Sequence, residues 1–264
     1  MPRYAHKVIL GAALAFCAAS ASVAADLPVK GPVYAPPPPV AIYNWTGFYI
    51  GVNAGYGWGE LDDAVSPLPS PAAFGAAPFT VRVEPEGFVG GIQFGYNWQT
   101  GNFVWGLEAD FQGTTLDETS VRAPLRTNLG VPIPGWNSRV TAEVDWFGTV
   151  RGRLGVTFMP ELLAYVTGGF AYGDVTVSSR TTFTPAAPFT YVGSGSSTET
   201  GWTVGGGLEY GFGNWSAKVE YLYVSLSAPS HVALPLAANP PFRLRHSVGD
   251  LDLNIVRAGL NYRF

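Results

Sequence analysis

The chain has 264 residues, which is room for one large domain or two small ones. Hydrophobic residues make up 47% of the chain and charged residues only 13%, about half the usual charged share. The formal net charge is −4, and no long apolar run follows the N-terminal region, which argues against a nucleic-acid partner and against a helical membrane span.

The first segment, residues 1–25, has the composition of a secretory signal peptide. Arg3 and Lys7 precede an apolar run of small residues that ends at Ala25. That run is short for an anchoring helix, which is the alternative. Cys17, the single cysteine, follows a bulky phenylalanine, which disfavours a lipoprotein acylation site. We therefore expect a cleaved signal and an exported mature chain without disulfides.

Residues 26–43 contain six prolines, four of them consecutive. Repeated proline holds the backbone extended, so this segment is predicted to be a spacer or tether in the periplasm. Docking into the aromatic groove of a partner is the alternative. The folded domain is predicted to span residues 44–264.

After the proline-rich segment, apolar side chains recur at every second position, which is the period of a β-strand. In WTGFYIGVNAGYGW, residues 45–58, large apolar side chains occupy the even positions, and mostly glycine or polar side chains occupy the odd ones. Residues 87–99 and 102–112 repeat the pattern, and the polar face of the second carries Glu108 and Asp110. Each segment is predicted to be a strand with two unlike faces.

The stretch EVDWFGTVRGRLG, residues 143–155, follows the same rule but carries four charges. Its apolar face holds Val144, Trp146, Val150 and Leu154, and the positions between them include Glu143, Asp145, Arg151 and Arg153. Four more strands are predicted at residues 162–177, 200–212, 215–224 and 251–264, which brings the total to eight. The alternation is least clear in 162–177, where both faces are partly apolar.

The predicted connections alternate in length. Three short ones, TGN, VTFMPE and GN, join the second strand to the third, the fourth to the fifth and the sixth to the seventh. The long ones cover about 59–86, 113–139, 178–199 and 228–247 and are rich in proline, serine, alanine and threonine. Short turns on one rim and long loops on the other are typical of an up-and-down barrel with two unlike ends.

Three features favour a membrane barrel over a soluble barrel or sandwich. The predicted strands have about 11–15 residues, enough to cross a bilayer at a tilt. One face is crowded with bulky residues, and the other mixes glycine with charges, which suits a narrow interior. Six tryptophans near strand ends are predicted to form interfacial girdles: Trp45, Trp58, Trp98, Trp105, Trp202 and Trp215. The sequence predicts an all-β fold, an eight-stranded antiparallel up-and-down transmembrane β-barrel with short periplasmic turns and four long extracellular loops.

The polar faces of the predicted strands carry a nearly balanced set of charges. The set is Glu108, Asp110, Glu143, Asp145, Arg151, Arg153, Glu209, Lys218, Glu220, Arg257 and Arg263. An eight-stranded barrel is only wide enough for its own side chains, and unpaired buried charges are costly, so we expect a linked salt-bridge network in the lumen. A narrow ion path lined by the same charges is the alternative.

Little in the mature sequence indicates catalysis. Its two histidines, His231 and His246, lie in or beside the last predicted loop. His246 precedes Ser247, but neighbouring residues on a strand point to opposite faces, so this pair is not expected to meet. Clusters of histidine and cysteine at metal-binding spacings are not found. We predict a protein that is not an enzyme and has no cofactor and no metal site.

Seven stretches, which together cover essentially residues 44–264, carry a family resemblance: YNWTGFYIGVNAGYGWG, GFVGGIQFGYNWQ, WFGTVRGRLG, YVTGGFAYG, GWTVGGGLEYGF, VEYLYV and the terminal NYRF. Together they resemble the small outer-membrane β-barrel proteins of alphaproteobacteria, labelled outer-membrane immunogenic proteins or porin-like opacity proteins. The resemblance implies an eight-stranded barrel and an abundant surface protein linked to envelope integrity. Some members contribute to host interaction or haem binding. It implies no catalytic residue.

The resemblance also bears on location and partners. Tyr262 and Phe264 resemble the C-terminal signal by which the barrel-assembly machinery recognises outer-membrane barrels. Outer-membrane lipid and lipopolysaccharide are the other expected partners, and peptidoglycan and host surface ligands are further candidates. The leading hypothesis is a structural, non-catalytic outer-membrane protein of a Gram-negative cell. The alternatives are a small-solute channel, and an adhesin or ligand receptor, for haem among others, that acts through its loops.

Overall fold

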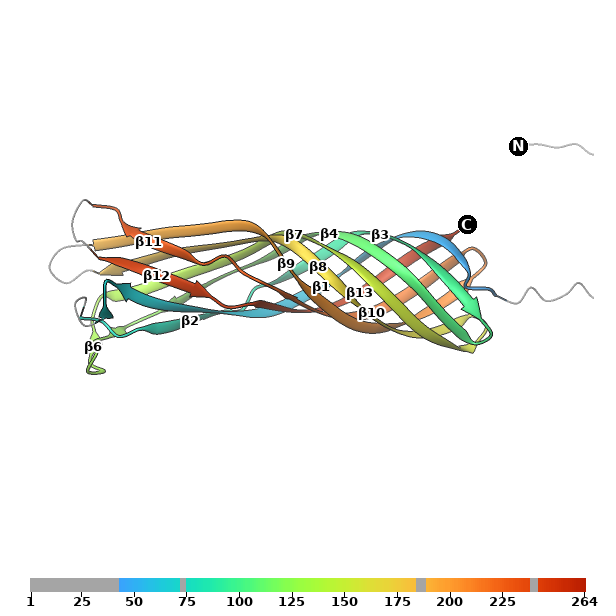
Figure 1. The fold of residues 1–264 in the computed structure, drawn as a ribbon, viewed down its shortest axis with the longest axis horizontal. Helices are drawn as coiled ribbons and strands as arrows, with labels where there is room; N and C mark the ends of the chain where they lie inside the picture. The colour runs from blue at the N-terminus through green and yellow to red at the C-terminus, as the bar shows by residue number, and fades with distance from the viewer. Residues whose placement is uncertain (1–42, 72–74, 184–188, 238–241) are drawn as a thin grey trace, which may run out of the picture. The chain divides into compact units, whose positions relative to one another are not determined.

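Figure 1 shows the computed structural model, which describes residues 43–71, 75–183, 189–237 and 242–264. The predicted signal peptide and almost all of the predicted proline-rich segment lie outside these residues. The strands of the described part are β1 (Gly47–Leu68), β2 (Phe79–Val83), β3 (Glu86–Thr100), β4 (Phe103–Arg122), β5 (Leu125–Arg126), β6 (Pro132–Ile133), β7 (Trp136–Met159), β8 (Leu162–Phe183), β9 (Phe189–Phe212), β10 (Trp215–Leu226), β11 (His231–Pro235), β12 (Arg243–Val248) and β13 (Leu251–Arg263). No helix within the described ranges is long and apolar enough to cross a membrane.

Eight strands close into a ring of antiparallel neighbours. The order is β1, β3, β4, β7, β8, β9, β10 and β13, and β13 pairs with β1 again. Closure leaves no unpaired edge along this part of the wall, as a sheet surrounded by lipid requires. The predicted fold class, an eight-stranded antiparallel transmembrane barrel, is confirmed.

Short turns join the strands at the periplasmic end, where the C-terminus also lies (Figure 1). Gly101, between β3 and β4, and Gly213, between β9 and β10, both have a φ of 61°. This left-handed conformation is strained for residues with a Cβ, so these two turns favour glycine.

The two faces of the wall follow the alternation of the sequence. On β1, Phe48 is 66% exposed and Val52 is 58% exposed, whereas Tyr49 and Asn53 are 4% and 6% exposed. In water, a barrel would fold with the bulky face inside, because burial of apolar surface drives folding. The exposed bulky face is therefore the surface that lipid covers.

Most of the residues predicted to form long loops belong to strands. β4 continues to Arg122 and β7 begins at Trp136, so only the middle of the predicted loop 113–139 connects them. β8 and β9 likewise extend into predicted loop 178–199, and β2, β11 and β12 occupy parts of the other two. Figure 1 shows these extensions continuing the wall away from the C-terminus. Their outward positions carry serine, threonine and charged residues in place of bulky apolar ones, which hid the strand pattern.

The extracellular part of this wall has its own pairings. β1 passes from β13 to β12, and β9 passes from β10 to β11, which pairs with β12. β2 pairs with the other edge of β1. In the described ranges, no backbone pairing joins β2 to β4, so the extracellular wall has a seam between these two strands.

A β-bulge at Asp145 changes which residues of β7 face the interior. Val144 pairs with Val175 of β8, and Trp146 pairs with the adjacent Asp174, so Asp145 is an extra residue on its strand. An extra residue reverses the alternation of faces on one side of the bulge relative to the other.

This bulge overturns the sequence prediction for two residues. Val144 and Phe147 are both buried, at 1% and 0% exposure, although two residues lie between them and an unbroken alternation would place them on opposite faces. Glu143 and Asp145 are exposed on the outer face of the wall. The prediction that Glu143 and Asp145 face the lumen is therefore wrong, because it assumed an unbroken period of two along β7.

Candidate functional site

The interior of the membrane-spanning wall contains a layer of charged side chains, which we call the charged layer. Its members are at most 3% exposed: Glu108 and Asp110 of β4, Arg151 and Arg153 of β7, Glu209 of β9, Lys218 and Glu220 of β10, and Arg257 of β13. They point inward because each alternates with outward apolar residues on its strand. Four acids thus face four bases.

Glu108 lies at the centre of the charged layer. Its carboxylate is 3.0 Å from Lys218 Nζ, 3.6 Å from Arg153 Nη1 and 3.8 Å from Arg257 Nη2. It also accepts a hydrogen bond from Arg151 Nη2. One carboxylate therefore compensates part of the charge of four cations.

Asp110 and Glu220 share two guanidinium groups. Asp110 Oδ2 is 2.9 Å from Arg151 Nη2 and 3.0 Å from Arg257 Nη2. Glu220 lies 3.2 Å from Arg151 Nη1 and 2.6 Å from Arg257 Nη2. Thr149 donates a further hydrogen bond of 2.9 Å to Asp110. These contacts offset the large cost of removing the charges from water.

Glu209 and Arg153 form a second branch of the charged layer. Arg153 Nη2 lies 2.6 Å from Glu209 Oε2, and its guanidinium is 4.0 Å from the ring centroid of Tyr165. Arg153 also donates a hydrogen bond of 3.1 Å to Tyr49 OH, which in turn donates to Glu108 at 2.7 Å. Neither tyrosine is among the residues predicted for the lumenal network, although the period of two places both at inward positions.

The structure brings together eight of the eleven residues predicted to form the lumenal network. Arg263 lies apart from them at the end of β13, with its guanidinium 4.0 Å from the ring centroid of Tyr43. Glu143 and Asp145 are on the outer face. The charged layer is therefore smaller than predicted, and its acids and bases are balanced in number.

Toward the extracellular end, apolar side chains replace the charged ones. We call this group the apolar plug: Leu61, Val81, Val83, Val89, Leu116, Val140, Ala142, Val144, Phe147, Ala171, Val175, Val177, Leu222, Val224, Leu226, Leu251, Leu253 and Ile255. Each is at most 3% exposed. This apolar section differs from the polar lumen that the charged strand faces predict.

Trp45 covers the periplasmic mouth of the barrel. Its side chain is 1% exposed and packs with Leu163 and Tyr165. Its Nε1 donates a hydrogen bond of 3.0 Å to the carbonyl of Pro160, and its backbone N–H donates one of 2.7 Å to the side chain of Gln99. The prediction that Trp45 belongs to the outer girdle is wrong, because the chain crosses the mouth before β1 begins.

The other five predicted girdle tryptophans lie on the outer surface. Trp58, Trp105, Trp202 and Trp215 are 44%, 47%, 52% and 43% exposed, and Trp98 stacks on Trp105 with 4.3 Å between ring centroids. The indole side chain is apolar with one polar N–H, so tryptophans at either end of the apolar band suit the interface between lipid and water.

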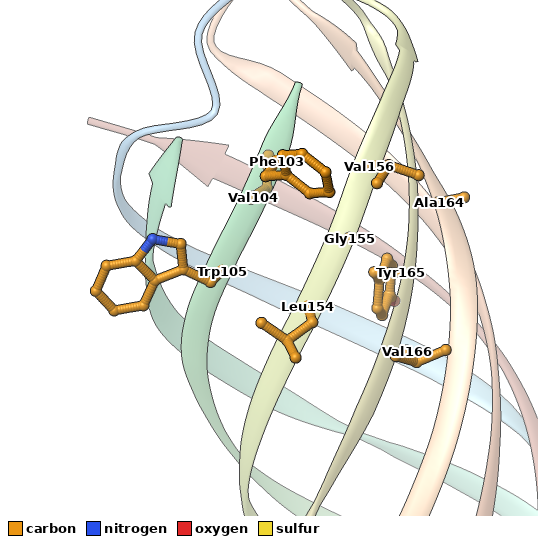
Figure 2. A pocket seen from close by; sticks show the side chains of 9 residues that line it. All are labelled: Phe103, Val104, Trp105, Leu154, Gly155, Val156, Ala164, Tyr165 and Val166. Carbon is orange, nitrogen blue, oxygen red and sulfur yellow. The ribbon is translucent and has the colours of Figure 1, made fainter. Parts of the chain in front are cut away.

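Figure 2 shows part of this outer surface near the periplasmic turns. Phe103 and Trp105 of β4, Leu154 of β7 and Val166 of β8 border a shallow groove with an almost entirely apolar lining. No charged side chain lines the groove. Its position on the lipid-covered face indicates a surface for acyl chains rather than for a polar ligand.

The C-terminal aromatic pair lies at the same rim. The rings of Tyr262 and Phe264 are 5.2 Å apart, and Tyr262 also packs against Trp215 at 5.0 Å. Phe264 is 77% exposed, and its N–H donates a hydrogen bond of 3.0 Å to the carbonyl of Phe48. The last residue is thus fixed to β1 through its backbone while its ring remains exposed.

A polar chain of contacts crosses the interior of the extracellular wall. His246 Nδ1 lies 2.5 Å from Asp63 Oδ2, and both side chains are fully buried. The ring of His231 stacks on that of His246 at 4.6 Å, and its Nε2 lies 2.7 Å from Ser179 Oγ. The carboxylate and the serine contact different histidines, so the four residues do not form a Ser–His–Asp relay. Ser247 is exposed and turned away from them.

Acidification is expected to loosen this part of the wall. Burial, and then the neighbouring His246, lower the pKa of His231 to about 4. An unfolded histidine has a pKa of about 6.5, so between these values the unfolded chain binds a proton that the folded chain does not. Stability is therefore lost as the pH falls from about 6.5 toward 4. Amide hydrogen exchange in β11, corrected for intrinsic rates, should be faster at about pH 4.5 than at about pH 7.5.

The matched variant is His231→Gln, which keeps a polar group near Ser179 but does not titrate. Most of the acid-dependent increase in exchange should disappear in this variant. An equal increase in the variant and the natural chain would show that another group controls the acid response.

Among the described residues, no group of three or more His, Cys, Asp or Glu side chains is arranged to hold a metal ion. The acids of the charged layer are instead occupied by arginine and lysine, and Asp63 is occupied by His246. Chemically, the interior therefore holds a set of mutually paired charges, with a buried apolar section on their extracellular side.

The chain is similar in sequence to known outer-membrane proteins. A family profile described as an outer membrane protein beta-barrel domain matches residues 10–264. The chain is 35% identical over 260 residues to the 31 kDa outer-membrane immunogenic protein of Brucella melitensis, covering 98% of this chain and 100% of that protein. It is 31% identical over 189 residues to the 22 kDa outer membrane protein of Rhizobium leguminosarum, covering 71% and 67% of the two chains. The solved structure of the outer membrane protein OprG from Pseudomonas aeruginosa is similar at a TM-score of 0.49 and 12% identity, over 84% of this chain and 99% of that one.

Proposed function

The chain belongs to the family of outer membrane protein beta-barrel domains. On this basis, we propose that it is a closed, non-catalytic barrel that supports envelope integrity and presents loops at the cell surface. Its relatives are outer-membrane proteins, and the chain shares their location in the outer membrane. The family resemblance inferred from the sequence is confirmed.

The filling of the interior carries the proposal of a closed barrel. From the periplasmic end outward, Trp45 covers the mouth, the charged layer follows, and the apolar plug lies beyond it. The charges of the layer are paired with one another, so they do not present a free charge to a passing ion. The plug supplies no polar group to replace the water that a permeating ion would have to lose.

The two alternative functions have less support. A small-solute channel would need a water-lined path, and Arg151 and Arg153, which would line it, are bound by Glu108, Glu209 and their neighbours. A ligand receptor that acts through its surface loops is compatible with the long extracellular wall. The apolar plug argues against a channel, because it separates the two ends of the interior, and it provides no support for a receptor.

Two further contacts belong to this proposal. The exposed ring of Phe264, beside Tyr262, is the group that the barrel-assembly machinery would recognise. Peptidoglycan is the candidate partner of the proline-rich segment 26–43. Neither contact is required for the closed interior.

A gene deletion tests the envelope role. Cells without the protein should become more sensitive to detergent and to antibiotics too large for general porins, and the natural gene should restore resistance. A variant in which residues 124–134 are replaced by a tight turn should restore it as well, because the barrel is unchanged. Unaltered sensitivity of the deletion strain would contradict the proposal. Failure of a folded, membrane-inserted short-loop variant to restore resistance would favour the receptor.

A further inference from the structure

Two arginines face each other on the outer surface of the extracellular wall. Arg139 of β7 and Arg180 of β8 are direct register partners, and both are exposed. Like charges in directly opposite positions destabilise a sheet, so the stability of the wall does not explain the pair. On the outer surface of the described residues, the ion pairs are those of Arg82 with Glu60 and Asp62, which leaves the two arginines without a carboxylate partner.

Hydroxyl groups form a row next to this arginine pair. Ser178 of β8 has Thr141 of β7 as its register partner on one side and Ser194 of β9 on the other. These three residues and the two arginines line one groove, together with Ser179, Val192 and Gly193. Guanidinium and hydroxyl groups supply several hydrogen-bond donors, and the groove contains no acidic side chain. Such a lining favours a phosphate group, which guanidinium binds with two parallel hydrogen bonds.

The groove lies at a defined level above the membrane. On β7, Trp146 stacks on Phe111 at the extracellular end of the apolar band, with 5.4 Å between ring centroids. Arg139 is several residues farther out on the same strand. At about 3.3 Å per residue along a tilted strand, the arginine pair stands roughly 15–20 Å beyond the band. This distance places the pair at the level of a glycolipid headgroup and not of its acyl chains.

Carboxylates occupy the level between the apolar band and the arginines. Glu143 and Asp145 lie on β7, and Asp174 lies opposite Trp146 on β8. An anion is repelled at this lower level and attracted at the level of Arg139 and Arg180. The outer surface therefore favours direct binding of a negatively charged group at the level of the two arginines, and not at the level of the carboxylates nearer the membrane.

We propose that Arg139 and Arg180, with the hydroxyls of Thr141, Ser178 and Ser194, bind a phosphate on the saccharide headgroup of outer-leaflet lipopolysaccharide. The groove faces outward from the barrel, where neighbouring lipid molecules stand, and it lies at the height of their phosphorylated sugars. The site is independent of the closed interior, so conduction through the barrel would leave it intact.

The experiment compares the natural chain with Arg139→Gln/Arg180→Gln in detergent micelles and phosphate-free buffer. The probe is a deep-rough lipopolysaccharide that retains the phosphates of its inner sugars, titrated and followed by tryptophan fluorescence. Loss of two charge-assisted contacts should weaken binding roughly 10- to 100-fold. Arg139→Lys/Arg180→Lys should fall between the two, because lysine keeps the charge but not the paired hydrogen bonds.

A matched control variant and a matched probe distinguish binding at this site from non-specific electrostatic attraction between the protein and lipopolysaccharide. Arg243→Gln/Arg245→Gln removes the same charge from exposed positions of β12 outside the groove, and it should bind like the natural chain. The same lipopolysaccharide after removal of its phosphates should bind all variants with the same low affinity. Without any ligand, the Gln/Gln variant of the pair should unfold at the same or a slightly higher temperature, because the like-charge contact is gone.

Three outcomes would overturn the proposal. One is equal binding by the natural chain and Arg139→Gln/Arg180→Gln. Another is equal loss in the β12 control, which would indicate net charge alone. The third is a defect that appears with heparin but not with lipopolysaccharide, which would assign the groove to an acidic polysaccharide instead.

Discussion

Replacement of Glu108 by alanine is expected to destabilise the barrel by about 3–5 kcal/mol, the cost typical of removing one partner from a buried ion pair. The carboxylate contacts Arg151 and Lys218 directly and lies within 4 Å of two more cations. Without it, four buried bases face three buried acids. Urea unfolding of the barrel in lipid vesicles, followed by tryptophan fluorescence, measures the change.

The control is Glu143→Ala, which removes the same side chain from the outer face of β7. It should change stability by less than about 0.5 kcal/mol, because exposed substitutions away from special contacts have small effects. The sequence pattern alone assigns both glutamates to the lumen, whereas the bulge at Asp145 places only Glu108 there. The two substitutions therefore distinguish an unbroken alternation on β7 from a bulged one. Equal destabilisation by the two substitutions would contradict the position of the bulge.

Deletion of Asp145 is expected to leave the extracellular wall folded, whereas deletion of Thr141 from the same strand should disrupt it. Asp145 is an extra outward residue beside the outward Trp146, so without it Val144 still points inward and Glu143 still points outward. Deletion of Thr141 instead reverses the faces beyond it, which turns Arg139 inward and the buried Val140 outward. Burying an unpaired guanidinium among aliphatic side chains costs several kcal/mol, so this part of the wall should unfold. Limited proteolysis of membrane-inserted protein from the outside should cut β7 beyond the bulge only in the Thr141 deletion.

Asp145→Ser keeps the residue count and should resist the protease like the natural chain. All three variants should still show the shift in gel mobility between unheated and heated samples if the membrane-spanning ring remains closed. Equal protease resistance of the two deletions would mean that β7 can relocate its bulge, and that the alternation of faces does not determine which residues of this segment point inward.

The sequence alone predicts the ring of eight strands well, because the same alternation of faces recurs in each strand. Each membrane strand carries a bulky outward face against lipid and a small or polar inward face, so an error in one strand does not alter the fold class. The eight charged-layer residues were found for the same reason. The bulge at Asp145 could not be read from the pattern, because the residue is polar and fits either face.

The apolar plug was missed although part of its signal is present. On β10 the inward positions pass from Lys218 and Glu220 to Leu222 and Val224 without a change of register. On β13 the same change runs from Arg257 to Ile255 and Leu253. Following the inward positions farther along each strand would have shown that the polar interior ends. Trp45 had no such signal, because the residues before β1 do not alternate.

Planar-bilayer recording of the purified, refolded protein tests the closed barrel most directly. Because the charged layer is paired and the apolar plug lies beyond it, the natural chain should give no reproducible unitary current at moderate voltage. Arg151→Ala should be silent as well, because the plug still separates the two ends. A stable, reproducible unitary conductance from the natural chain would contradict the account and make the protein a channel.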